Sequence, residues 1–206
     1  MTAARLAAAL ALAVSAAAAQ PATDPDWPCV QRKVLHLSVG QMWTGPVPED
    51  RDVWRADAVA ARLAPILAAR RTDLSEAEEL IAAVGGGDGL DRGERLTRVF
   101  LGAFDLIDRE RARIVEGIGR FARRQRALSE RIDALQAEID ARAAETAEDD
   151  VDALDRLEEM RDELAWDVRV FEERQRALTY ACESPVILER RAFALARAIA
   201  AEMEGG

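Results

Sequence analysis

The stretch FLGAFDLIDRERARIVEGIGRFARRQRALSERIDALQAEI, residues 100–139, carries the pattern that decides the fold. Its apolar residues recur at alternating steps of four and three, and only Arg111 and Gln125 interrupt them. A heptad pattern sustained over about five repeats is typical of a coiled-coil helix. The positions are Phe100, Phe104, Ile107, Arg111, Ile114, Ile118, Phe121, Gln125, Leu128, Ile132, Leu135 and Ile139.

A second series with the same spacing follows further along the chain. It comprises Leu154, Leu157, Arg161, Leu164, Val168, Phe171, Gln175, Leu178 and Cys182. Residues 143–152 between the two series are polar and acidic. Because a short connection makes neighbouring helices antiparallel, we predict an antiparallel coiled-coil hairpin over residues 95–184, with its turn near Glu148. The fold class is therefore all-α.

The heptad spacing also predicts which residues of the two arms face each other. If the turn centres on Glu148, Ile139 lies opposite Leu157, and Ile114 lies opposite Cys182; a shift by one heptad is the competing register. The segment 121–128 (FARRQRAL) resembles 171–178 (FEERQRAL). In this register Phe121 would face Gln175 and Gln125 would face Phe171. A buried glutamine lowers stability but disfavours slipped registers; the alternative is that these glutamines bind a ligand.

The flanking sequence predicts a small helical head on the base of the hairpin. Residues 56–94 read as short helices and a Gly-rich linker, with Pro65 kinking or splitting the first helix and Ser75 with Glu78 capping the second. The Gly85–Gly89 linker lacks the Gly-Lys-Ser/Thr ending of a phosphate loop. Ser184-Pro185 predicts the start of a separate C-terminal helix over residues 185–206. The second arm would then cover only part of the first.

Residues 1–19 have the pattern of a secretory signal peptide. A short basic start precedes the apolar run from Leu6 to Ala18, and small residues follow at a cleavage site near Ala19. The run is too short for a comfortable membrane span, and no second such run follows. We therefore expect a periplasmic or secreted chain with no membrane span after cleavage.

Residues 20–55 hold five of the prolines and three tryptophans, and we expect an extended segment laid over the helices. In an oxidising compartment the two cysteines, Cys29 and Cys182, are expected to form a disulfide that fastens this segment. The chain-entropy model gives about 5 kcal/mol for a loop of about 150 residues. Two free thiols or an intermolecular bridge are the alternatives.

The stretch Asp26-Trp-Pro-Cys-Val-Gln-Arg-Lys-Val34 resembles the start of an uncharacterised group of small exported bacterial helical proteins. The resemblance runs to Pro46 and implies no activity.

The residue inventory disfavours familiar enzyme chemistry. The single histidine, His36, makes neither a multi-histidine zinc site nor paired histidine relays, and a disulfide leaves no thiol nucleophile. We predict no catalytic residue, metal site or cofactor; the acidic turn lacks the spaced ligands and glycine of a calcium loop. A carboxylate-based enzyme stays as a third alternative. The net charge of −10 disfavours nucleic acid and anionic membranes.

Two aromatic residues, Trp166 and Tyr180, fall on the outer face of the second arm, away from the seam. They suggest either a protein contact or cover by the N-terminal segment, and we favour the cover. The arginines near residue 123 are expected to match acids on the opposite arm.

The function predicted from these features is that of a non-enzymatic periplasmic interaction or scaffold protein. It would act through the hairpin on an unknown exported protein, with a homodimer possible. The alternative is a chaperone or carrier that holds clients between hairpin and head.

Overall fold

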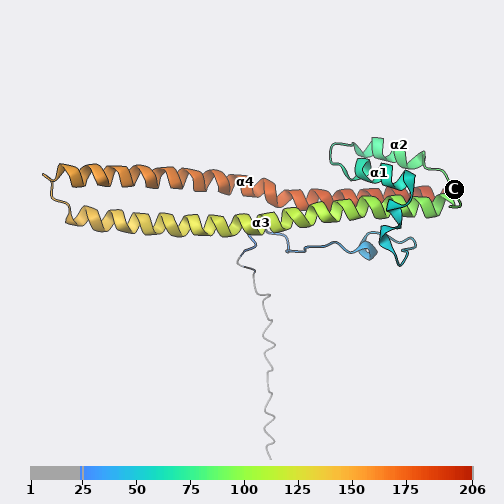
Figure 1. Ribbon diagram of the computed structural model, residues 1–206, viewed down its shortest axis with the longest axis horizontal. Coiled ribbons are helices and arrows are strands. Elements are labelled where there is room, and N and C mark those ends of the chain that lie inside the picture. The colour runs from blue at the N-terminus through green and yellow to red at the C-terminus, as the bar shows by residue number, and fades with distance from the viewer. Residues whose placement is uncertain (1–23, 25, 206) are drawn as a thin grey trace, which may run out of the picture.

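The structure, a computed structural model, describes residue 24 and residues 26–205. The described part contains α-helices and 3-10 helices and no strand. It forms a long helical hairpin with a small helical head at its base and an extended segment along one side (Figure 1). The predicted fold class is confirmed. The predicted signal peptide, residues 1–19, lies outside the described residues.

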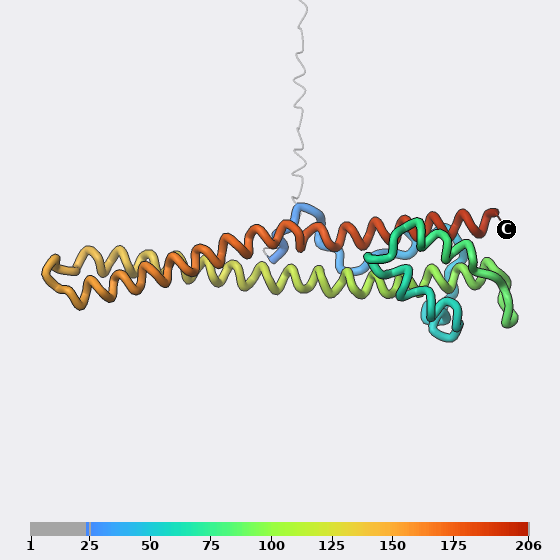
Figure 2. The backbone as a smooth tube through the Cα atoms, turned by 90° about the horizontal axis from the view of Figure 1, so that it is seen from above, coloured from blue at the N-terminus to red at the C-terminus, as the bar shows by residue number. Residues whose placement is uncertain are grey.

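Two helices of equal length form the hairpin, α3 (Arg92–Glu145) and α4 (Val151–Glu204). Asp91 and Glu94 form a capping box at the start of α3, so two otherwise unpaired backbone N–H groups are satisfied there. At the far end the chain turns through residues 146–150, and the Asp150 carboxylate caps α4 by accepting from the Ala153 N–H at 3.0 Å. The turn therefore centres on Glu148, as predicted. Both arms run side by side along the whole length (Figure 2).

The predicted helix start at Ser184-Pro185 is wrong, because α4 continues through both residues. Proline lacks the N–H that would continue the helical ladder, and Figure 1 shows a bend in α4 near this point. Two side-chain contacts lie on the turn before the proline: the Ser184 hydroxyl donates to the Tyr180 carbonyl at 3.2 Å, and the Gln31 side chain donates to the Cys182 carbonyl. Pro185 itself is buried. The second arm is thus 54 residues long, equal to the first, and there is no separate C-terminal helix.

The head consists of α1 (Ala58–Ala68) and α2 (Leu74–Ala82), preceded by the 3-10 helices η1 (Val39–Gln41) and η2 (Arg51–Arg55). α1 packs mainly on α3 and α2 on α4. Two local predictions are wrong. Pro65 lies inside α1, so the alternative that it splits the helix is wrong, while a kink there stays a prediction. The α2 helix begins at Leu74 with Asp73 as its N-cap residue, so Ser75 lies in the first turn and is not the cap.

The core lies where the head meets the base of the hairpin. Phe100 is fully buried at its centre, and the Trp43 ring stacks on it with centroids 4.3 Å apart. α1 approaches α3 closely at Gly102, where a β-carbon would lie 2.8 Å from the Ala64 Cβ. The other large side chains that are fully buried include Leu67, Ile81, Leu96, Ile107, Leu188, Leu195 and Ile199.

A buried ion pair ties the head and the Gly-rich linker to α3. Arg95 and Asp57 are both buried, with Nε and Oδ2 3.2 Å apart, and Arg95 also donates to the carbonyls of Gly85 and Gly87. Burial alone would raise the pKa of the Asp57 carboxyl. Hydrogen bonds from the Ala60 N–H and from Arg95 outweigh the burial, so its pKa lies below the ordinary value.

Residues 26–43, here called the strap, run along the hairpin. The Asp108 carboxylate accepts from the Leu37 N–H at 2.6 Å and lies 2.8 Å from His36 Nδ1. Arg111, buried in α3, donates to the Val34 carbonyl at 2.5 Å. Arg111 therefore interrupts the heptad series because it holds the strap. The strap forms no strand, and apart from η1 it is irregular.

Candidate interaction surface

The hairpin divides into a covered base and a bare distal arm. At the base, the head and the strap cover α3 and α4, and the seam residues there are buried. In the distal arm, residues 127–174, no other described segment packs on the two helices (Figures 1 and 2). Most seam residues there, such as Leu128, Ile132 and Val168, are only half-buried. The distal arm is thus a two-helix coiled coil open to solvent on both sides.

The predicted register is supported at one of its two glutamines. The Gln125 side chain is buried and donates to the Phe171 carbonyl at 3.2 Å, so Gln125 faces Phe171. Gln175 is exposed, however, and lines a groove beside Cys182. The predicted burial of Gln175 in the seam is therefore wrong. Its pairing with Phe121 stays a prediction.

Charge matching across the hairpin differs from the prediction. Arg123 and Arg126 pair with Asp26 of the strap, at 3.1 Å and 2.8 Å, rather than with acids on α4. Hydrogen bonds from Arg126 and then from Arg123 lower the pKa of the Asp26 carboxyl. A cross-arm ion pair does occur further out, where Nε of the exposed Arg131 lies 2.9 Å from Oδ2 of the buried Asp167.

The two cysteines come together at the bend of α4. The Sγ atoms of Cys29 and Cys182 lie 1.98 Å apart, at disulfide distance, and no free cysteine occurs among the described residues. Trp27 Nε1 donates to the Gln31 carbonyl at 2.5 Å, which closes residues 27–31 into a turn. The apex residue, Val30, is fully exposed. Beside this turn lies an open groove of about 640 Å³ that also contacts Leu178 and Ile187.

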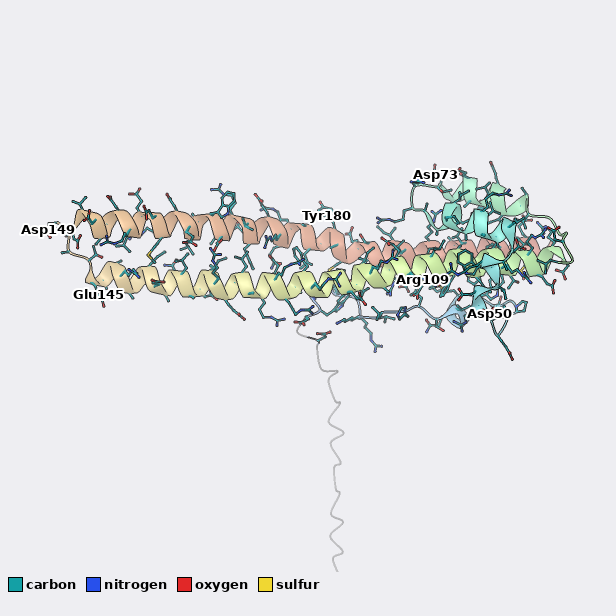
Figure 3. The ribbon with its side chains drawn as sticks, viewed as in Figure 1. Asp50, Asp73, Arg109, Glu145, Asp149 and Tyr180 are labelled. Carbon is teal, nitrogen blue, oxygen red and sulfur yellow. A yellow bond between two sulfur atoms is a disulfide. The ribbon has the colours of Figure 1, made fainter. Side chains whose placement is uncertain are left out.

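Trp166 and Tyr180 are exposed, at 60% and 74% of their surface. The predicted cover by the N-terminal segment is therefore wrong for every described residue of that segment. The strap crosses to α4 at Cys182, while Tyr180 lies on the side of α4 that carries the head (Figure 3). The Arg169 guanidinium lies 6.0 Å from the centroid of the Trp166 ring.

The two aromatics belong to a longer row on one helix face, which we call the outer face. Trp166, Glu173 and Tyr180 are spaced by seven residues, so they lie in line and opposite the seam. The row spans roughly 21 Å from Trp166 to Tyr180. Ile187, another seven residues on and 45% exposed, extends it. The same spacing in the sequence would have found Glu173 and Ile187, which the sequence interpretation missed. The outer face comprises Trp166, Arg169, Val170, Glu173, Arg176, Ala177 and Tyr180.

The acidic turn lies at the end of the hairpin opposite the head, with Glu145 and Asp149 on its two sides (Figure 3). Within the described ranges, no group of three or more His, Cys, Asp or Glu side chains is placed to hold a metal ion. A small cavity at this end is lined by two arginines, Arg142 and Arg156, as well as by acids. Nor does any helix of the described part have the length and apolar character needed to cross a membrane.

No protein-family model, curated protein or solved structure matches the chain. Its function must therefore be inferred from its own surfaces.

Proposed function

We propose that this chain is a non-enzymatic, exported interaction protein that presents the outer face of α4 to a protein partner. The observation that carries the proposal is the exposure of Trp166 and Tyr180 in line on the outer face of α4. Tryptophan, tyrosine and arginine are the residues most enriched among binding hot spots, and all three occur on this face.

Neither Trp166 nor Tyr180 contributes to the packing of the fold. The seam, the head core and the strap anchors use the opposite face of α4 or lie nearer its end, so neither ring packs in the core. The outer face holds both aromatics on a rigid helix outside the head core, where a partner can approach.

Export is supported by the fastened cysteine pair together with the predicted signal peptide, because disulfides persist in oxidising compartments. A carboxylate-based enzyme is less well supported. General-acid carboxyls need a raised pKa, whereas Asp24, Asp26 and Asp57, the described acids whose pKa clearly departs from the ordinary value, all have it lowered. Lys33, Arg126 and Arg95 respectively hydrogen-bond to them.

A chaperone or carrier role is the second candidate, and the groove beside the disulfide favours it. The exposed side chains of Val30 and Ile187 at this groove could receive an apolar segment of a client. This alternative predicts that an environment-sensitive dye binds the folded chain and that Val30→Ser with Ile187→Ser abolishes that binding.

Photo-crosslinking in the exporting cell tests the interaction proposal. A photoreactive residue placed at position 166 or at position 180 should give one discrete adduct in near-stoichiometric yield. The matched control places the same residue at Ala134, which is exposed on α3 of the same arm, and should give none. Equal, diffuse labelling from all three positions would count against a dedicated surface on α4.

A further inference from the structure

The outer face reads nearly the same in both directions from its centre. Counted outward from Glu173, an arginine occurs three or four residues away on each side, as Arg176 and Arg169. A small apolar residue also occurs three or four residues away on each side, as Val170 and Ala177. An aromatic residue occurs seven residues away on each side, as Trp166 and Tyr180. A near-palindromic row on a helix is self-complementary when two such helices run antiparallel, because a two-fold axis brings each half against the other.

We propose that a second copy of this chain is the partner and that two α4 helices cross antiparallel about Glu173. In this arrangement Trp166 of each copy lies against Tyr180 of the other. The two Glu173 side chains meet near the two-fold axis, and Arg169 and Arg176 of the other copy flank each of them with opposite charge. The inference rests on the proposed function: the interaction surface is the same, and the partner is a second copy of the chain.

Local charge favours a second copy at this stretch over other parts of the surface. Residues 166–180 contain three acids, Asp167, Glu172 and Glu173, and three arginines, Arg169, Arg174 and Arg176, so the stretch is neutral. The whole chain carries −10, and the acidic turn repels a like surface. Two copies can therefore approach here without the repulsion that opposes contact elsewhere, and they gain opposite-charge pairs on contact.

The head restricts the orientation of the two copies. It lies on the same side of α4 as Tyr180 (Figure 3), so parallel arms would press the two heads together. Antiparallel arms carry the heads to opposite ends. The helices must then cross at an angle so that the tip of each arm passes beside the other head. At a crossing angle of about 50°, common for packed helices, the arms separate by roughly 20 Å at a point 30 Å from the crossing.

Sedimentation equilibrium and light scattering of the oxidised full chain give the first test. We expect a reversible dimer, and we expect Trp166→Ala with Tyr180→Ala to raise its dissociation constant by on the order of tenfold or more. Far-UV circular dichroism should be unchanged, because both side chains are exposed.

A charge-swap mixture gives the sharper test. Glu173→Arg makes the row wholly basic, and Arg169→Glu with Arg176→Glu makes it wholly acidic. Each variant alone should self-associate at least about tenfold more weakly than the parent, whereas their equimolar mixture should form a heterodimer. The control Asp133→Arg changes the charge on exposed α3 by the same amount as Glu173→Arg and should leave the dimer intact.

A parent chain that stays monomeric at about 100 µM overturns the proposal, since such self-association would be weaker than about −5.5 kcal/mol. Variants that each stay monomeric but do not pair when mixed also overturn it. If the chain is monomeric yet position 166 still gives a discrete adduct, self-pairing is wrong and the interaction surface stands. If the adduct is absent as well, the proposed function fails too.

Discussion

The base and the distal arm of the hairpin are built from the same two helices but are stabilised differently. At the base, Phe100 of α3 is fully buried beneath Trp43 and the head. In the distal arm, Phe171 of α4 occupies an equivalent seam position but is only half-buried. A heptad seam alone thus holds two helices together, while full burial requires a third layer. The arm therefore keeps one face of α4 available for binding.

The disulfide between Cys29 and Cys182 sets the boundary between the two regions, and its removal should have the largest effect. Replacing both cysteines with serine opens a loop with a sequence separation of 153 residues. The chain-entropy model gives a loss of about 5 kcal/mol in the free energy of unfolding, and about 2 kcal/mol would be a low value.

Urea unfolding monitored by circular dichroism measures this loss, and reduction of the parent chain is the matched control. Hydrogen exchange should also increase along α3 near Arg111, where the strap is released. Unchanged stability and exchange would show that the ion pairs of Asp26 and the contacts of Asp108 suffice to hold the strap.

Truncation of aromatic side chains probes the two regions directly. Phe100→Ala at the base should lower the free energy of unfolding by about 4 kcal/mol, because it leaves a cavity in a closed core. Phe171→Ala in the arm should cost roughly half as much, since water already reaches that side chain. Chemical denaturation of both variants measures the difference. Equal losses would mean that the seam near Phe171 is as closed to water in solution as the core at the base.

Breaking the buried ion pair at the base should cause the third largest loss of stability. Asp57→Ala leaves the buried Arg95 with only the exposed Asp88 as an acidic partner and removes the N-cap of α1, so we expect a loss of about 3 kcal/mol. Asp167→Ala in the arm is the matched control. Its partner Arg131 has an exposed side chain that stays hydrated, so about 1 kcal/mol is expected.

The effect of Asp57 should depend on pH. Its pKa is lowered in the folded chain, so its stabilisation is fully present above the unfolded value of about 3.9 and is lost as pH falls through the folded value. The parent and Asp57→Ala should therefore converge in stability in strong acid. A difference that persists unchanged there would mean that the carboxylate charge is not what stabilises the base.

Much of the fold could be predicted because it repeats locally. Heptad spacing marks the seam over both arms, and the acidic stretch around Glu148 marks the turn. The same frame placed Trp166 and Tyr180 on the outer face. Ser184-Pro185 misled the prediction because a serine before a proline is typical of a helix start, whereas burial of Pro185 and a bend carry α4 through it.

Contacts between distant segments could not be predicted. Asp26 pairs with Arg123 and Arg126 only because the disulfide brings the strap back to the middle of the hairpin. Local charge patterns favoured acids on the opposite arm, which are nearer in sequence. Likewise the strap leaves the outer face uncovered, because it reaches α4 at Cys182, which lies on a different side of the helix from Tyr180.

The separation of the two cysteines also affects biosynthesis. A ribosome makes the chain from its N-terminus, so Cys29 appears long before Cys182, which is separated from it by 153 residues. At typical elongation rates of about 5–20 residues per second, the first thiol waits roughly 8–30 s for its partner. With no other cysteine in the sequence, the waiting thiol has no wrong intramolecular partner. The closure of the bond therefore reports that nearly the entire hairpin has been synthesised.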